Sequence, residues 1–385
     1  MQKKSLITTR YDRLNLYFQT QQDFRRKRLI GSRRLSPAIG GVLAAFAIMA
    51  MLASGARAAS TTNVIYSFAG GADGEYTDTD LVIDSAGNLY GTSVLGGDFG
   101  GGTVFQLTPS GDSWIHTVLY SFSGGADGGE PYKGVTLDTE GNLYGTAVTG
   151  GAGSCEGGCG VAYKLTNSAG TWTQTVIHAF TGGDDGSGPG AGLTIDKRGN
   201  LYGMAPTGGA NGLGVVYQLH PEQSGNWTLK VIHTFTGGTD GATGSAGRML
   251  LRGGHLYGAA TAGGANGKGT AFELTPTPSG EWDFKTIYSF KGQPDAGFPY
   301  GGLTFDAAGN LYGTTSEGGL GSGTIFELTP GPTGKWTESV AHRFEGPPDG
   351  AFAYNGMVGD GAGNFYGATV HGGSDDEGAI YKFTP

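Results

Sequence analysis

Short runs of β-branched and aromatic residues alternate with polar turn residues along most of the chain. In one representative stretch the runs cover 302–306, 310–315, 323–328 and 336–344, each bounded by Gly, Asp, Asn or Pro. Runs of this length and composition predict β-strands. The Asp-x-x-Gly-Asn sequence at 306–310 predicts a tight turn, because Asp bonds nearby backbone and Gly or Asn tolerates positive φ. The stretch therefore predicts four short strands.

This four-strand pattern recurs six times. A tyrosine in a motif like Gly-Asn-Leu-Tyr-Gly and a phenylalanine that ends the last run keep the same spacings, 54, 58, 55, 55 and 54 residues. The tyrosines are Tyr90, Tyr144, Tyr202, Tyr257, Tyr312 and Tyr366, and the phenylalanines are Phe68, Phe122, Phe180, Phe235, Phe290 and Phe344. Four strands in a repeat of about 55 residues are typical of a β-propeller blade.

The two ends of the repeat region complement each other. The last repeat stops after its third strand, at 379–384, whereas 63–68 reads as a fourth strand without the preceding three. Pairing these ends would close the ring and remove an exposed strand edge. We therefore predict an all-β, six-bladed β-propeller with four strands per blade, the N-terminal strand completing the last blade.

Composition supports this fold class. The 385 residues include 77 Gly and 15 Pro, yet 37% are hydrophobic and 11% aromatic. Glycine costs about 1 kcal/mol at each helix-interior site relative to alanine, so a helical protein is excluded. The apolar content excludes a disordered chain.

Residues 1–58 predict a signal peptide with a long basic n-region. An apolar run at 38–53 follows the basic residues and ends before Ala56-Arg57-Ala58, a small-residue cleavage site. The run is shorter than the roughly 20 residues that span a bilayer, so we expect cleavage after Ala58, with an uncleaved anchor as the alternative. Arg33-Arg34 leaves both Sec and twin-arginine export open. The mature protein, 59–385, is expected to be secreted, periplasmic or at the cell surface, without a membrane span.

Charge separates these two parts of the chain. Residues 1–58 hold 11 of the 24 basic residues and two of the 33 acidic residues, so the remainder is strongly acidic. Nucleic-acid binding depends on clustered Lys and Arg, so we expect no nucleic-acid partner.

The repeat resembles a known family. Its pattern is Tyr-Ser-Phe-x-Gly-Gly-x-Asp-Gly, then Gly-Leu-x-x-Asp-x-x-Gly-Asn-Leu-Tyr-Gly, then Gly-Thr-x-Phe-x-Leu-Thr-Pro. Over 63–385 this resembles the GloVer tandem repeat of exported bacterial proteins. The resemblance implies export and a propeller-like fold, and the family has no settled activity that it could imply.

Aromatic residues break the symmetry of the repeats. They occur eight and ten positions after the motif phenylalanine, in the loops that lead into blades 5, 6, 1 and 2, whereas blades 3 and 4 carry small residues there. The aromatic residues are Tyr76, Tyr132, Phe298, Tyr300, Phe352 and Tyr354. Flat rings near polar groups suit sugar stacking or a protein hot spot. The alternative is that each ring packs on its neighbouring loop.

Two other sets of residues are candidates for chemistry. Asp73, Asp127, Asp185, Asp240, Asp295 and Asp349 recur on the loop face and could together hold Ca²⁺, although Asp-Gly turns repeated with the blade are the favoured explanation. No other cofactor is expected. Cys155 and Cys159 occur in a four-residue insertion in blade 2 and predict a local disulfide in an exported chain.

No residues form a familiar nucleophile motif. His178, His233 and His342 replace tyrosines at one repeat position, which favours packing. Our hypothesis is a non-catalytic, monomeric propeller that binds a glycan or a surface protein through one loop face. The alternatives are a propeller enzyme of the lyase, lactonase or glycosidase type acting on a carbohydrate, and a structural envelope module. A polar cluster at the axis would favour the enzyme, and buried aromatic rings would favour the structural module.

Overall fold

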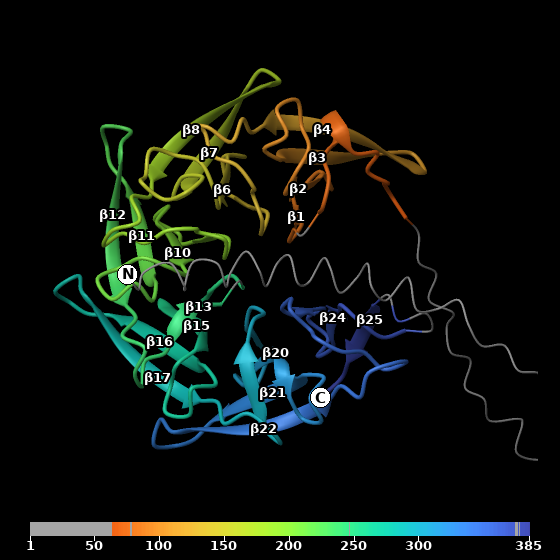
Figure 1. The fold of residues 1–385 in the computed structure, drawn as a ribbon. Helices are drawn as coiled ribbons and strands as arrows, with labels where there is room; N and C mark the ends of the chain where they lie inside the picture. Colours follow the sequence, from red (N-terminus) through yellow and green to blue (C-terminus); the bar gives the residue numbers. More distant parts are fainter. Residues whose placement is uncertain (1–63, 78, 246, 374–375, 377) are drawn as a thin grey trace, which may run out of the picture. The chain divides into compact units, whose positions relative to one another are not determined.

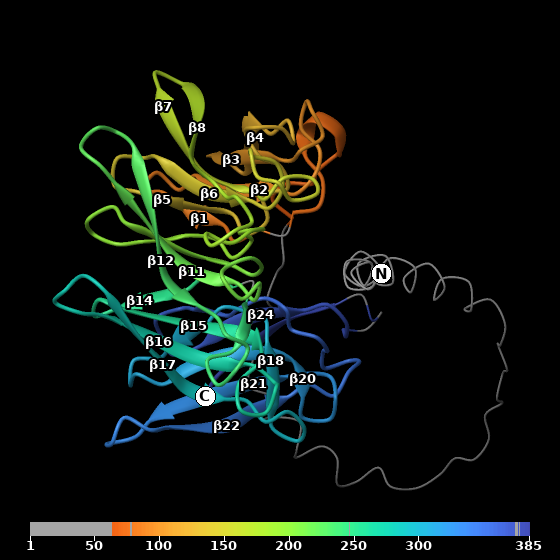
Figure 2. The ribbon, with the colours of Figure 1, turned by 60° about the vertical axis from the view of Figure 1, so that its left-hand side comes forward.

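The computed structural model describes residues 64–385 except 78, 246, 374–375 and 377. The described residues are all β, apart from a short 3-10 turn, η1 (Gly71–Asp73). Six antiparallel sheets follow one another in chain order around a common axis (Figures 1 and 2). The predicted six-bladed propeller is therefore confirmed. Within the described residues, no helix is long and apolar enough to cross a membrane. The predicted signal peptide, 1–58, lies outside the described residues.

The blades are built from the following strands. Blade 1 contains β1 (Val82–Ile83), β2 (Leu89–Ser93), β3 (Thr103–Ser110) and β4 (Ser113–Ser121), and blade 2 contains β5 (Val135–Leu137), β6 (Leu143–Ala147), β7 (Val161–Ser168) and β8 (Thr171–Ala179). Blade 3 contains β9 (Thr194–Ile195), β10 (Leu201–Ala205), β11 (Val215–Pro221) and β12 (Trp227–Thr234). Each of these three blades begins with a short inner strand and ends with a long outer one.

Blades 4 and 5 carry one additional short strand, because the loop that leads into each blade also pairs with its second main strand. Blade 4 contains β13 (Ala242–Gly244), β14 (Leu250–Arg252), β15 (His255–Ala262), β16 (Thr270–Pro276) and β17 (Trp282–Ser289). Blade 5 contains β18 (Ala296–Pro299), β19 (Thr304–Phe305), β20 (Leu311–Gly318), β21 (Thr324–Pro330) and β22 (Trp336–Arg343). Blade 6 contains β23 (Val358–Gly359), β24 (Phe365–Thr369) and β25 (Ala379–Phe383).

The predicted Asp-x-x-Gly-Asn turns are present. In blade 5, Asn310 N–H donates to Asp306 Oδ1 at 2.8 Å, and Gly309 has a φ of 94°. A side-chain bond of this kind fixes a turn that glycine can enter without steric cost. The turn joins β19 to β20 and brings the motif tyrosine into register with the inner strand, as Thr304 opposite Tyr312 shows.

Aromatic rings hold neighbouring blades together. The phenylalanine after each outer strand packs edge-to-face on a ring of the next blade's third strand, as in Phe122 with Tyr163 at 5.0 Å. The glycine after each motif tyrosine makes room for this third-strand ring. A Cβ on Gly145 would lie 2.3 Å from the Tyr163 hydroxyl oxygen. Only glycine therefore fits at this position without displacing the ring.

The predicted closure of the ring by the N-terminal strand is wrong for this structure. Residues 64–68 carry no strand, and among the described residues the last sheet consists of β23, β24 and β25 alone. The segment still makes the contacts with the next blade that the other repeats make, because Tyr66 stacks on His116 at 4.4 Å and Phe68 packs on Phe105 as Phe122 packs on Tyr163. These contacts hold the segment on blade 1. What the described part of the segment lacks is the backbone pairing with β25. Ile380 of β25 is consequently 82% exposed, whereas its counterparts in blades 1 to 5 are at most 1% exposed.

Candidate functional site

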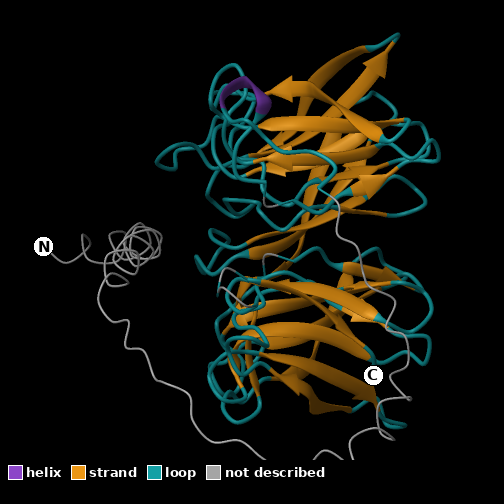
Figure 3. Ribbon diagram, turned by 90° about the vertical axis from the view of Figure 1, so that its right-hand side faces the viewer, coloured by secondary structure: helices purple, strands orange, loops and turns teal. Residues whose placement is uncertain are grey.

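The strands run between two loop faces, which Figure 3 shows in teal on either side of the sheets. One of them, here called the aromatic face, is formed by the loops that lead into each blade and by the loops after each second strand. The two kinds of loop are joined by bridges such as Ala351 with His371 in blade 6. This pairing fixes where the eighth residue after each motif phenylalanine lies.

That eighth residue has a left-handed backbone in every blade. Its φ lies between 54° and 65° for Tyr76, Glu130, Gly188, Thr243, Phe298 and Phe352. Left-handed backbone is unfavourable for residues other than glycine by roughly 1–2 kcal/mol, and strain of this kind concentrates at functional sites. Inter-blade hydrogen bonds hold it in place, as when Phe352 N–H donates to the Ser322 carbonyl oxygen at 2.8 Å.

The aromatic residues of blades 5 and 6 form one cluster. Tyr300 and Tyr354 meet edge-to-face with ring centroids 5.2 Å apart, and Phe352 stacks beside Tyr354. His371 packs edge-to-face on Phe352 at 5.9 Å. Tyr300 and Tyr354 are 38% and 37% exposed. We call Tyr300, Phe352, Tyr354 and His371 the aromatic cluster.

The other predicted rings lie outside this cluster. Lys268 Nζ lies 4.4 Å from the centre of the Phe298 ring and 3.9 Å from Glu317 Oε2. Tyr76 is 64% exposed on blade 1, and Tyr132 is partly buried on blade 2. Three of the six predicted rings thus remain more than a third exposed, which differs from the burial expected of a purely structural module.

Sequence reasoning did not select His371 or Lys268 as site residues. The signal for His371 is its place beside the Gly372-Gly373 pair, where the corresponding residues in the other blades are Leu95, Thr149, Thr207, Ala262 and Glu317. Its Nδ1 lies 3.9 Å from Asp376 Oδ1. The cluster therefore has polar groups at its edge as well as flat rings.

Two basic residues lie near the axis beside the cluster. Lys133 Nζ donates to Asn355 Oδ1 at 2.8 Å, and Asn355 directly follows Tyr354. Arg248 reaches from blade 4 to blade 2, where its guanidinium donates to Thr136 Oγ1 at 2.7 Å. The axis thus carries two cations and an amide, and Asp80 of blade 1 lies within electrostatic reach of Arg248.

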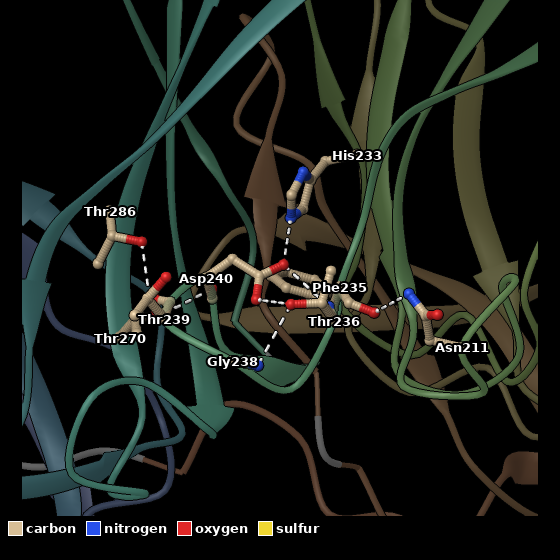
Figure 4. Close-up of polar contacts among 9 residues, drawn as sticks. All are labelled: Asn211, His233, Phe235, Thr236, Gly238, Thr239, Asp240, Thr270 and Thr286. Carbon is tan, nitrogen blue, oxygen red and sulfur yellow. Dashed lines mark hydrogen bonds and ion pairs between the residues drawn. The ribbon is translucent and has the colours of Figure 1, made fainter.

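The repeated aspartates serve their own loops. In Figure 4, Asp240 accepts hydrogen bonds from Thr236 N–H at 2.9 Å and from the Thr236 hydroxyl, and it lies 3.1 Å from His233 Nε2. Burial opposes ionisation of Asp240, but these hydrogen bonds hold its pKa below the usual value. The same ring-to-carboxylate contact occurs in Tyr66–Asp73, Tyr120–Asp127, His178–Asp185 and His342–Asp349.

These contacts favour a structural role for the five aspartates. Within the part of the chain that the structure describes, no three His, Cys, Asp or Glu side chains lie together so as to hold a metal ion. Calcium binding stays an untested prediction. His233 also stacks on Phe284 at 3.7 Å, so burial lowers its pKa although Asp240 opposes this effect. The packing role expected for this histidine position agrees with these contacts.

The predicted disulfide is present. Cys155 and Cys159 are joined in the inserted loop of blade 2. The Cys159 carbonyl oxygen accepts a hydrogen bond from Gly188 N–H of the following blade at 2.9 Å. The bridge therefore shapes the loop that supports the left-handed residue of blade 3.

The chain belongs to the Gloeobacter/Verrucomicrobia repeat family. The model of this family matches residues 52–250 and 214–385, which together cover the whole propeller. The resemblance to the GloVer repeat is thus confirmed. No curated protein matches the sequence.

Solved structures that resemble this chain share little sequence with it. A protein of unknown function from Dyadobacter fermentans is 10% identical, with a TM-score of 0.46 over 78% of this chain and 92% of that one. A putative oxidoreductase (glucose dehydrogenase) from Thermus thermophilus is 12% identical, with a TM-score of 0.47 over 81% and 98% of the two chains. A Lactobacillus plantarum protein is 13% identical, with a TM-score of 0.44 over 80% and 84%. Likenesses this distant carry no argument about function.

Proposed function

We propose that the protein is an exported, non-catalytic propeller that binds a glycan through the aromatic cluster of blades 5 and 6. The observation that carries this proposal is the exposed pair Tyr300 and Tyr354. Their perpendicular rings offer a sugar one flat face and one edge. Stacking of rings, with polar groups at the edge of the patch, is the usual basis of sugar recognition by aromatic side chains.

The strain of the backbone supports the same proposal. Phe352 has a φ of 57°, and its neighbours Ala351 and His371 are joined by a bridge between the two loops. A bulky residue in this conformation costs free energy that a glycine would not. The backbone that carries the ring is therefore held in place before a ligand arrives, which lowers the entropy lost on binding.

Glycan-array binding of the purified protein tests the proposal. Tyr300→Ala and Tyr354→Ala should each lower the affinity for a positive glycan by about tenfold, because each removes one stacking face. Tyr366→Ala is the matched control, since Tyr366 is a tyrosine of similar exposure on β24. It should leave the affinity unchanged.

Two results would contradict the proposal. The first is an array without any bound glycan. The second is a bound glycan whose affinity is indifferent to both cluster substitutions. Capture of a surface protein that depends on Tyr300 and Tyr354, with no glycan bound, would assign the same face to a protein hot spot instead.

A further inference from the structure

A positive charge stands near the axis at a position where most blades have glycine. On the inner strand of each blade, one residue is paired with the motif tyrosine, and the position in question lies two residues before it. This position is glycine in blades 2, 3, 5 and 6, Asp80 in blade 1 and Arg248 in blade 4. The glycines are Gly134, Gly192, Gly302 and Gly356. Arg248 therefore introduces a long cationic side chain where the repeat has none.

The guanidinium of Arg248 uses few of its donors within the protein. Its two Nη atoms donate to Thr136 Oγ1 at 2.7 Å and to the Val135 carbonyl oxygen at 3.1 Å. Its Nε is buried and has no acceptor among the described residues. An arginine has five donor hydrogens, so three of them are left for other groups.

The charge of Arg248 also lacks a close counter-ion. No carboxylate in the described ranges lies within ion-pair distance of the guanidinium, and Asp80 acts on it only from farther away. Burying a cation without a counter-ion is unfavourable, because the cation loses hydration that no opposite charge replaces. Such a group is expected where a ligand supplies the missing anion.

The backbone of Arg248 lies beside the loop that carries Tyr300, and its guanidinium extends towards blades 2 and 3. A Cβ on Gly302 would lie 3.3 Å from the Arg248 carbonyl oxygen, and Gly302 follows Tyr300 by two residues. On the other side, a Cβ on Gly192 would lie 3.5 Å from Arg248 Nε and 3.2 Å from the Lys133 carbonyl oxygen. Lys133 in turn contacts Asn355, which follows Tyr354. The inner rim thus connects Arg248 to both tyrosines of the cluster.

We propose that the ligand is an acidic glycan of the uronic acid type, whose carboxylate binds at Arg248 while a sugar ring stacks on the aromatic cluster. This inference rests on the proposed glycan-binding function and names its ligand class. Guanidinium and carboxylate groups form charge-assisted hydrogen bonds, roughly twice as strong as neutral ones. The Asn355 side chain is exposed at the same rim and supplies an amide for sugar hydroxyl groups.

Calorimetric titration with short oligogalacturonates and with their methyl esters tests the proposal, because esterification removes the charge and keeps the rings. The acid should bind at least tenfold more tightly than the ester. Arg248→Gln should lower the affinity for the acid about tenfold and leave the ester unchanged. Arg252→Gln is the matched control, since Arg252 ends the same strand, β14, and its guanidinium lies over Phe305.

The salt dependence of binding by the unmodified protein gives a second test, which does not require the variant to fold. Affinity of the unmodified protein for the acid should fall as salt rises, and affinity for the ester should not. Equal affinity for acid and ester, or preference for a sulfated or neutral glycan, would overturn the acidic ligand while glycan binding stands. Failure of every glycan to bind would overturn both proposals.

Discussion

Blades 3 and 4 and blades 5 and 6 share one backbone plan but differ in what their loops present. In both pairs the eighth residue after the motif phenylalanine has a left-handed backbone, at Gly188 and Thr243 in one pair and at Phe298 and Phe352 in the other. The first pair presents small residues, and the second presents rings. The difference shows that the propeller holds this position in one geometry whatever side chain it carries. Because the backbone geometry is the same, the side chains at this position decide what each blade can bind.

The largest expected effect on stability comes from changing a glycine that both pairs of blades need for inter-blade packing. A Cβ on Gly203 of blade 3 would lie 2.3 Å from the Tyr217 hydroxyl oxygen, and one on Gly313 of blade 5 would lie 2.5 Å from Phe326 Cζ. Overpacking of this kind costs about 2 kcal/mol, so Gly203→Ala and Gly313→Ala should lower the free energy of unfolding by similar amounts. Urea unfolding measures both. A loss in one blade alone would show that the two pairs do not share this need.

A smaller and stabilising effect is expected when one residue of blade 3 is replaced by its counterpart in blade 5. The Tyr217 hydroxyl is buried without a hydrogen-bond partner among the described residues, and burial raises the pKa of Tyr217 well above its usual value. Blade 5 has Phe326 at the same place. Tyr217→Phe should therefore stabilise the protein by about 1 kcal/mol, because a buried unsatisfied hydroxyl is removed. Lower stability of this variant in urea would show that the hydroxyl has a partner.

The cost of the left-handed backbone is tested at Gly188 of blade 3, which occupies the position of Phe352 in blade 6. A Cβ on Gly188 would meet only Val148 at an ordinary contact distance, 3.8 Å, so the change adds no steric clash. Gly188→Ala should cost about 1 kcal/mol through its φ of 65° alone. Gly183→Ala is the control, since Gly183 is a loop glycine of the same blade without a positive φ. Equal effects of the two changes would contradict the strain argument.

The smallest expected effect is a difference in pH dependence between blade 3 and blade 4. His233 occupies the position of Tyr288, and burial lowers its pKa in the folded protein. The unfolded chain therefore binds the proton more readily, so His233 reduces stability as the pH falls through its unfolded pKa of about 6.5. His233→Tyr should lose less stability than the unmodified protein between pH 7 and pH 5. Parallel curves for the two proteins would show that His233 does not titrate differently on folding.

Much of the fold followed from the repeat. The strands of blade 5 were predicted at 302–306, 310–315, 323–328 and 336–344, and the structure places β19 to β22 within or close to these runs. The exposed rings Tyr300 and Tyr354 were also selected from their position in the repeat. The strand prediction succeeded because a period shared by six copies defines where each strand lies. The binding role of the two rings stays a prediction. The closure by 63–68 failed because the segment keeps the ring contacts with blade 1 but does not pair with β25, and strand pattern alone does not determine whether two distant chain segments pair.

The sequence by itself determined the strand pattern, the number of repeats, the turn chemistry and the local disulfide, since each depends on residues close together in the chain. Only the tertiary structure decided which rings of the aromatic face touch one another and that Arg248 crosses from blade 4 to blade 2. It also decided that Tyr66 and Phe68 pack on blade 1. Such contacts join residues of different blades, and they depend on how the blades are arranged around the axis rather than on any local preference of the chain.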